Sequence, residues 1–313
     1  MKISNLVLAA MIVLAAGAPG SGSGAPGMPS AKAAVSSKHF DRVLVVVLEN
    51  QSYVSTMKDP YFQQLAEQGT NFTDFHAVAH PSYPNYLAMV AGSTYGIHGT
   101  FGDDQRTFPD DAGHRTIGDF LSWKNYAEDY PAKPGQAPYL YDTAGKYARK
   151  HVPFLSFEKV QKETFANVVG VDFQEAHNSF VSDVEASRKN PNDPQFRPLP
   201  EYMFYSPNLI DDGHDSTLTT ASDWLRNFLD KSLPPDARKG TLIVVTFDEA
   251  MGPELRSNHI YTVFLGDMVK KGEKVDQRYD HYDVLRTIEA NFGIKETLND
   301  GDAEASVIGN IWK

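Results

Sequence analysis

The sequence predicts a three-layer α/β/α sandwich with a mostly parallel sheet. Two continuous apolar runs rich in β-branched residues, 42–48 and 241–247, are typical of strands in the middle of such a sheet. Amphipathic helical patterns alternate with strand-like runs, which indicates helices packed on both faces of the sheet. Hydrophobic residues make up 41% of the 313 residues, enough for a large buried core.

The individual elements follow from the position of each pattern. Besides the two strong strands, shorter apolar runs predict strands at 201–205 and 261–265. The stretches 130–138 and 190–200 are rich in Pro, Gly or polar residues and predict loops rather than domain boundaries. Apolar residues at helical spacing predict helices at 60–68, 84–91, 218–229 and 284–291.

The first 33 residues have the pattern of an export signal. Lys2 supplies the positive end, residues 6–16 form the apolar run, and residues 31–33 give a small-x-small cleavage site. The apolar run is too short to span a bilayer. We therefore expect a signal peptide over 1–33, a linker remnant over 34–40 and one domain over 41–313. The protein is expected to be secreted or periplasmic, with no integral membrane segment after signal removal.

The net charge and the absence of cysteine narrow the possible partners and the possible chemistry. The formal charge of −11, without any cluster of Lys and Arg, argues against a nucleic-acid partner. The chain contains no cysteine, so disulfides and a thiol nucleophile are excluded.

Acidic residues follow both strong strands. Glu49 and Asn50 follow the first strand, and Asp248 and Glu249 follow the second. The carboxyl ends of parallel strands share one edge of a sheet, so these four side chains are expected to meet. Like charges so close raise one another's pKa, and a hard divalent cation with oxygen ligands is the usual relief. Each pair alone is better explained as a cap of a following helix or turn, but the two together favour a metal site.

Ser82 lies in the motif His80-Pro81-Ser82-Tyr83-Pro84-Asn85-Tyr86. Pro84 suits the first turn of a helix, which places Ser82 at or just before the N-cap. A hydroxyl there faces free backbone N–H groups and the positive end of the helix dipole, which favours an alkoxide and an incoming phosphate. Taken alone, this segment is better explained by an ordinary capping serine.

A third polar segment, 206–215, lies between a predicted strand and a predicted helix. There His214 could donate a proton to a leaving oxygen or bind metal, and Asn208 could hold a phosphoryl oxygen. Asp and Gly crowding is also typical of a plain turn. His151 and His281 lie in two further segments that suggest a role.

Five stretches together resemble the ordered motifs of one phosphoesterase family. That family contains secreted bacterial and fungal acid phosphatases, a mycobacterial secreted acid phosphatase that acts on phosphoinositides, and larger bacterial phospholipases C. The chain is more similar to the short phosphatases, and the additional C-terminal modules of the phospholipases are not expected here. The stretches are 49–53, 80–86, 207–215, 246–249, and 281–282 with 287–289.

The resemblance implies an alkaline-phosphatase-like fold and assigns roles to the candidate residues. It implies one divalent metal ion, with Ser82 both as a ligand and as the hydroxyl nucleophile. His214 and His151 are the catalytic candidates for protonating the leaving oxygen. The substrate-binding candidates are Asn208, Asp212 and His281, and the metal ligands are Glu49, Asn50, Ser82, Asp248 and Glu249.

The expected activity is metal-dependent hydrolysis of phosphate monoesters through a phosphoserine on Ser82. Substrates would be small monoesters, with phosphoinositides or other phospholipids also open. Calcium, magnesium, manganese and zinc all suit the ligand set. The alternatives are a phospholipase C-type phosphodiesterase, a sulfatase or phosphonate-type hydrolase on a related scaffold, and a secreted binding protein without catalysis. The oligomeric state does not follow from the sequence.

Overall fold

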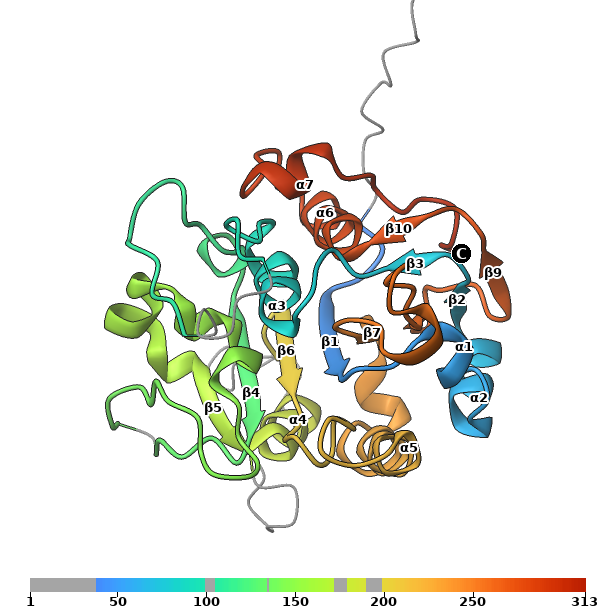
Figure 1. Ribbon diagram of the computed structural model, residues 1–313, viewed down its shortest axis with the longest axis horizontal. Coiled ribbons are helices and arrows are strands. Elements are labelled where there is room, and N and C mark those ends of the chain that lie inside the picture. Colours follow the sequence, from blue (N-terminus) through green and yellow to red (C-terminus); the bar gives the residue numbers. More distant parts are fainter. Residues whose placement is uncertain (1–37, 99–104, 134, 172–178, 190–198) are drawn as a thin grey trace, which may run out of the picture. The chain divides into compact units, whose positions relative to one another are not determined.

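An eight-stranded sheet forms the centre of the fold, with the strand order β5-β4-β6-β1-β7-β8-β2-β9 (Figure 1). The computed structural model describes residues 38–98, 105–133, 135–171, 179–189 and 199–313. The signal expected over 1–33 and residues 34–37 of the expected linker lie outside the described residues. The strands are β1 Arg42–Leu48, β2 Thr70–Phe72, β3 Phe75–His76, β4 Trp123–Glu128, β5 Val168–Val171, β6 Tyr202–Ser206, β7 Thr241–Phe247, β8 Thr262–Leu265, β9 Glu273–Val275 and β10 Tyr279–Asp280.

Seven α-helices accompany these strands in the described part of the chain. In Figure 1, α3 and α6 lie on one side of the sheet, and α4 and α5 lie on the other. The sandwich predicted from the sequence is therefore confirmed. The helices are α1 Tyr53–Thr56, α2 Pro60–Gln68, α3 Ser82–Ala91, α4 Ser179–Lys189, α5 Leu218–Asn227, α6 His281–Asn291 and α7 Asp300–Glu304.

The sheet is mostly parallel, as predicted. β1 pairs in parallel with β6 and β7, and β4 pairs in parallel with β5 and β6. Only β8 runs against its neighbours, β7 and β2. Strands β1 and β7 are buried along almost their whole length, which explains why both read as unbroken apolar runs.

Side chains alternate between the two faces of strand β6 and so connect both helical layers. The Tyr202 hydroxyl donates a hydrogen bond to the Met89 carbonyl of α3 over 3.1 Å, and the Phe204 ring lies 6.1 Å from Tyr86 of the same helix. On the opposite face, the Tyr205 ring packs 4.5 Å from Phe228, just after α5. This alternation is the period of two expected for a strand covered on both faces.

Element boundaries agree closely with the sequence pattern. Strands β1 and β7 and helix α2 have the predicted bounds, and β6 and β8 differ from prediction by one residue at the ends. Helices α3 and α6 begin earlier than predicted, because their first turns are polar and lack the apolar spacing that marks a helix. Helix α5 ends at Asn227, and the predicted turn at 228–229 continues as a π-helix, Phe228–Ser232. Of the predicted loop 190–200, only residues 199–200 are described, and they are irregular.

Among the described residues, no helix combines the length and the apolar character needed to cross a bilayer.

Candidate active site

The carboxyl ends of β1 and β7 place two acidic residues side by side. Leu48 and Phe247 are register partners, so Glu49 and Asp248 leave the sheet at the same edge. The Asp248 N–H donates to the Leu48 carbonyl over 3.1 Å, which keeps the two chains paired one residue beyond the strands. Both carboxylates are fully buried.

Ser82 faces the same edge from the first turn of α3. Its side chain is buried, and its Oγ donates a hydrogen bond to Oε1 of Glu249 over 3.2 Å. Pro81 is the N-cap residue of this helix, so Ser82 is the first helical residue rather than the cap that the sequence pattern suggested. The hydroxyl is therefore free to face the acidic residues.

The Asn50 amide lies against Asp248 and allows two orientations. With nitrogen turned toward Asp248, it donates hydrogen bonds to Oδ1 over 2.9 Å and to Oδ2 over 3.2 Å. With oxygen turned toward Asp248, two acceptors face each other, an arrangement that a bound cation would stabilise.

Burial and mutual repulsion dominate the electrostatics of this group. Burial raises the pKa of Asp248 well above its usual value, and the charges of Glu49 and Glu249 raise it further. Burial also opposes ionisation of Glu49, but the charge of the adjacent His151, with further contributions from Lys150 and His214, outweighs burial and lowers the pKa of Glu49 to about 2. Neither oxygen of Glu49 has a hydrogen-bond partner among the described residues. Buried carboxylate oxygens of this kind suit a hard divalent cation.

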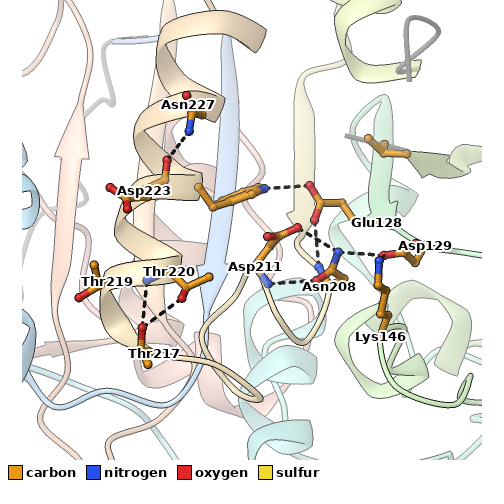
Figure 2. Close-up of a pocket in the computed structure, with 12 residues that line it drawn as sticks. Glu128, Asp129, Lys146, Asn208, Asp211, Thr217, Thr219, Thr220, Asp223 and Asn227 are labelled. Atoms are coloured by element: carbon orange, nitrogen blue, oxygen red, sulfur yellow. Dashed lines mark hydrogen bonds and ion pairs between the residues drawn. The ribbon is translucent and has the colours of Figure 1, made fainter. Parts of the chain in front are cut away.

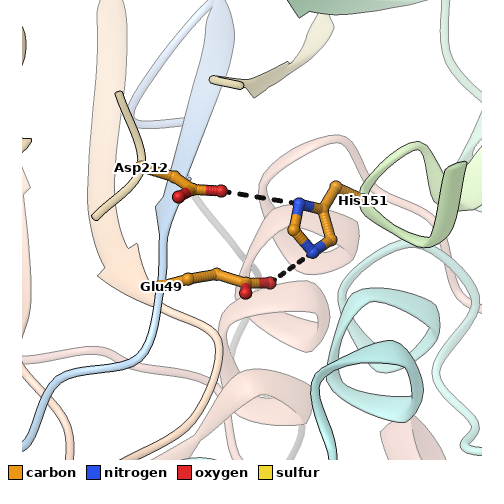
Figure 3. Close-up of side chains that lie close together, drawn as sticks. All are labelled: Glu49, His151 and Asp212. Carbon is orange, nitrogen blue, oxygen red and sulfur yellow. Dashed lines mark ion pairs between the residues drawn. The ribbon is translucent and has the colours of Figure 1, made fainter. Parts of the chain in front are cut away.

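Among the described residues, Glu49, His151 and Asp212 form a group that could hold a metal ion, with one ligand atom of each within 4.8 Å of the others (Figure 3). Nε2 of His151 lies 2.5 Å from Oε1 of Glu49, and its Nδ1 lies 3.5 Å from Oδ2 of Asp212. The ring stacks on Tyr86 at 4.7 Å. This group shares Glu49 with the predicted ligand set, while His151 and Asp212 were predicted for other roles. His151 is enclosed between two acidic side chains and is almost fully buried.

His214 lies at the mouth of the site. About a third of its side chain is exposed, its Nε2 is 3.9 Å from Oε2 of Glu49, and its Nδ1 is 2.7 Å from Oδ1 of Asp215. The His214 N–H donates to Oδ1 of Asp212 over 2.7 Å. A carboxylate on one ring nitrogen fixes the ring and leaves the other nitrogen directed toward the site.

Asn208 lies in a polar pocket of about 580 Å³ next to the site (Figure 2). Its Nδ2 donates to Asp129 over 2.8 Å and to Asp211 over 2.9 Å, and its Oδ1 accepts from the N–H groups of Ile210 and Asp211. These contacts occupy both ends of the amide and hold the turn that carries Asp212. Contact with a substrate would require some of them to break.

His281, the first residue of α6, contacts the backbone of Asp248. Its Nε2 donates to the Asp248 carbonyl over 2.9 Å, and the ring is buried against Phe75. Burial lowers its pKa, which favours the neutral ring. The structure thus places His281 where its buried ring holds the backbone of Asp248.

Two residues that were not predicted as site residues, His80 and Glu128, also belong to this site. His80 Nδ1 contacts Oε2 of Glu249, and its Nε2 is 2.9 Å from the Leu255 carbonyl. Glu128, at the end of β4, lines the pocket and accepts hydrogen bonds from Tyr205 and Trp224. An acidic residue at a strand end was the available signal for Glu128, but strand β4 itself was not predicted.

Comparison with known proteins identifies the class of fold. A solved protein of the alkaline phosphatase superfamily from Vibrio parahaemolyticus superimposes with a TM-score of 0.54 at 13% identity, covering 85% of this chain and 70% of that one. The fold is therefore of the alkaline-phosphatase type, as the resemblance implied. Residues 47–295 match the model of the phosphoesterase family, and the chain belongs to this family.

Curated relatives support the family assignment. A probable acid phosphatase of Kluyveromyces lactis is 34% identical over 84% of this chain and 61% of its own length. The phosphatidylinositol-3-phosphatase of Mycobacterium tuberculosis is 32% identical over 87% of this chain and 83% of its own length. The chain spans about three fifths of the length of the fungal acid phosphatases that it matches.

Proposed function

We propose that the chain is an exported, metal-dependent phosphatase that hydrolyses phosphate monoesters through Ser82. The observation that supports this most directly is the Ser82 hydroxyl at 3.2 Å from Glu249, beside the buried side chains of Glu49 and Asp248. Two of the curated relatives described above carry names of phosphomonoesterases. Export is proposed from the signal pattern at 1–33.

Glu49, Asn50, Asp248, Glu249 and Ser82 would hold one divalent cation. A cation held there would neutralise charge on the phosphate oxygens and favour the ionised serine hydroxyl. Calcium, magnesium, manganese and zinc all remain compatible with a set of oxygen donors that has histidines nearby.

The reaction would proceed in two displacements. Oγ of Ser82 attacks phosphorus while its proton passes to Glu249, the acceptor that it faces. The bond between phosphorus and the ester oxygen breaks, and His214 protonates the departing oxygen. A water molecule then gives a proton to His214 and attacks the phosphoserine. The bond from phosphorus to Oγ breaks, and the serine regains its proton from Glu249.

His214 suits the proton-transfer role better than His151. The ring of His214 is partly exposed at the mouth of the site, whereas His151 is buried between Glu49 and Asp212. We therefore assign to His151 a positioning role, in which its ring holds the side chains of Glu49 and Asp212 in place.

Ser82→Ala tests this function, with Ser222→Ala as a matched control. Ser222 is equally buried and also donates to a carboxylate, Asp59, over 2.8 Å. We expect Ser82→Ala to lose at least about a thousandfold in kcat on a chromogenic phosphate monoester. Ser222→Ala should retain activity. Full activity in Ser82→Ala would exclude Ser82 as the nucleophile.

Lipid-borne phosphate monoesters are a second candidate substrate class. Three exposed aliphatic side chains, Val54, Met251 and Leu255, follow closely after the proposed metal ligands in the chain. The Val54 N–H donates to Glu254 over 2.7 Å, so the segments that carry these side chains are neighbours. Exposed aliphatic groups beside the site favour an apolar alcohol group on the substrate.

Rates on matched substrates separate these possibilities. We would compare a soluble aryl monoester, phosphatidic acid in phosphatidylcholine vesicles, and a phosphocholine diester. Activity on the two monoesters but not on the diester supports the proposal. Activity on the diester alone would support the phospholipase C alternative, and inactivity on all three would favour a binding protein.

A further inference from the structure

The Asn258 side chain connects two loops that carry proposed site residues. Its Oδ1 accepts a hydrogen bond from the Ala250 N–H over 2.8 Å, and its Nδ2 donates to the Ala79 carbonyl over 2.8 Å. Ala250 directly follows Glu249, and Ala79 precedes Ser82 by three positions. One buried amide therefore spans the loop of the nucleophile and the loop of the acidic residues.

The backbone around Asn258 also pairs with segments next to the site. The Ala77 N–H donates to the Asn258 carbonyl over 2.9 Å, and the Ile260 N–H donates to the Phe75 carbonyl over 2.9 Å. On the other side, the Tyr53 N–H donates to the His259 carbonyl over 3.0 Å. Residues 258–260 thus lie between the segment that follows Asn50 and the segment that leads to Ser82.

A second asparagine, Asn85 of α3, also holds this loop. Its Oδ1 accepts from the N–H groups of Val78 and Ala79, each over 3.0 Å. Its Nδ2 donates to the Ala79 carbonyl over 2.9 Å, so this carbonyl accepts from both asparagines. Asn85 fixes the loop to the helix that carries Ser82, while Asn258 fixes it to the loop that carries Glu249.

Few residues could replace Asn258. Its φ of 53° lies in the left-handed region, which asparagine tolerates better than most residues. The bridge also needs one acceptor and one donor on a single short side chain, which the amide supplies. Glycine would keep the backbone conformation and lose the bridge. Aspartate would keep the acceptor for Ala250 and lose the donor to Ala79.

We propose that Asn258 is a positioning residue that sets the separation between Ser82 and Glu249. It touches neither substrate nor the reacting atoms, and it acts through the loops that it joins. The inference rests on the function proposed for Ser82 and Glu249. It explains how two loops that are far apart in the sequence are held at a fixed separation.

Asn258→Gly is the principal test. We expect kcat on a soluble aryl phosphate monoester to fall about 10- to 100-fold with KM nearly unchanged, because small displacements of reacting groups have effects of this size. The rise in Tm on adding MnCl2 or CaCl2 to chelator-treated protein should become smaller, because Glu249 is no longer held beside Ser82.

Asn291→Ala provides a matched control. Asn291 is also buried and also ties two segments together: its Oδ1 accepts from His39 and Phe40, and its Nδ2 donates to the Phe40 carbonyl. None of these groups belongs to the proposed site. We expect Asn291→Ala to lower Tm while keeping kcat and the response to added cation.

Asn258→Asp keeps the test decisive if the glycine variant does not fold. It should fold, because aspartate also tolerates the left-handed conformation. Its kcat should fall because the Ala79 carbonyl loses one of its two donors, the one that links it to the loop of Glu249. Wild-type kcat and an unchanged cation response in either folded Asn258 variant would overturn the proposal. If the wild-type protein hydrolyses no monoester, the proposed function fails, while the Tm response to MnCl2 or CaCl2 still tests the positioning role.

Discussion

Ser82 and Glu249 are 167 positions apart in the chain, yet the serine hydroxyl donates to the carboxylate over 3.2 Å. Neither residue lies in a strand. Glu249 follows the buried strand β7, whereas Ser82 begins helix α3, and the connecting loops bring the two side chains together. The geometry of the proposed site therefore depends on the loops as much as on the sheet, and the predictions below test both.

Asp248→Asn should stabilise the metal-free protein and abolish activity. Asp248 is buried, and the charges of Glu49 and Glu249 add to the cost of ionising it. A neutral side chain of similar size removes that cost, so we expect the free energy of unfolding at pH 8 with chelator to rise by about 1–3 kcal/mol. Urea denaturation measures this change. Asp183→Asn, which breaks a pair with Lys124 at 2.5 Å, should bring no such gain. Lower stability in Asp248→Asn would contradict the prediction.

His214→Ala should lower kcat most for substrates with poor leaving groups. Protonation of the departing oxygen typically contributes about 10²- to 10⁴-fold, and it matters little when that oxygen belongs to an activated phenol. A series of aryl and alkyl monoesters would show a steeper dependence on leaving-group pKa in the variant. His151→Ala is the comparison, because we expect it to reduce stability without changing that slope. Equal losses on all esters in His214→Ala would remove His214 from the role of proton donor.

Gly213→Ala should disturb the site through a backbone contact. Gly213 has φ 100°, and an added Cβ would lie 2.9 Å from the Glu49 carbonyl oxygen. Gly145 has a similar φ of 97°, but an added Cβ there meets no atom within 4 Å. Both alanine variants carry the strain of the left-handed region, about 1 kcal/mol or more. Only Gly213→Ala should also lower kcat, which steady-state kinetics on both variants would establish. Equal kcat in the two proteins would argue against this contact.

Glu289→Gln should flatten the dependence of stability on pH. Burial raises the pKa of Glu289 from 4.5 to about 8 in the folded protein. Below pH 4.5 the group is protonated in both folded and unfolded states and costs nothing. As the pH rises toward 8, the unfolded chain loses the proton and the folded protein keeps it, so stability falls by at most about 5 kcal/mol.

Denaturation of Glu289→Gln between pH 4 and pH 9 checks this expectation. Relative to wild type, the variant should gain stability as the pH rises through this window. Glu296→Gln is the control, because Glu296 is mostly exposed and pairs with Arg115 at the surface. A wild-type pH profile in Glu289→Gln would show that another group causes the fall.

The central part of the fold could be predicted because its signal is local. Strands β1 and β7 are buried on both faces, so their composition alone marks them. Strand β4 lacks that mark. It includes Lys124, which reaches Asp183, and Asn125, a buried amide that hydrogen bonds to Ser206. Polar residues satisfied by distant partners cannot be distinguished in the sequence from polar residues in a loop.

In the candidate site, too, only the residues with a local sequence signal could be placed. Glu49, Ser82 and Asp248 could be placed at one edge because each follows or begins a recognisable element. The positions of His151, between Glu49 and Asp212, and of His281, behind Asp248, depend on packing between remote segments. The position of Asn258 depends on a loop conformation that could not be predicted from the sequence. The sequence predicted which residues lie at this edge of the sheet, but it did not predict how deeply each side chain is buried.

The pairing of β1 with β7 has a consequence for folding. Arg42 and Thr241 are register partners, so the central strand pair closes a loop of 199 positions (241 − 42), about three quarters of the domain. Contacts between such distant residues slow folding, because the entropy of loop closure is lost before the contacts form. Glu49 and Asp248 meet only when this pair forms. A refolding chain should therefore regain cation binding and secondary structure together, late and in one cooperative step, with no partly folded form that already carries the site.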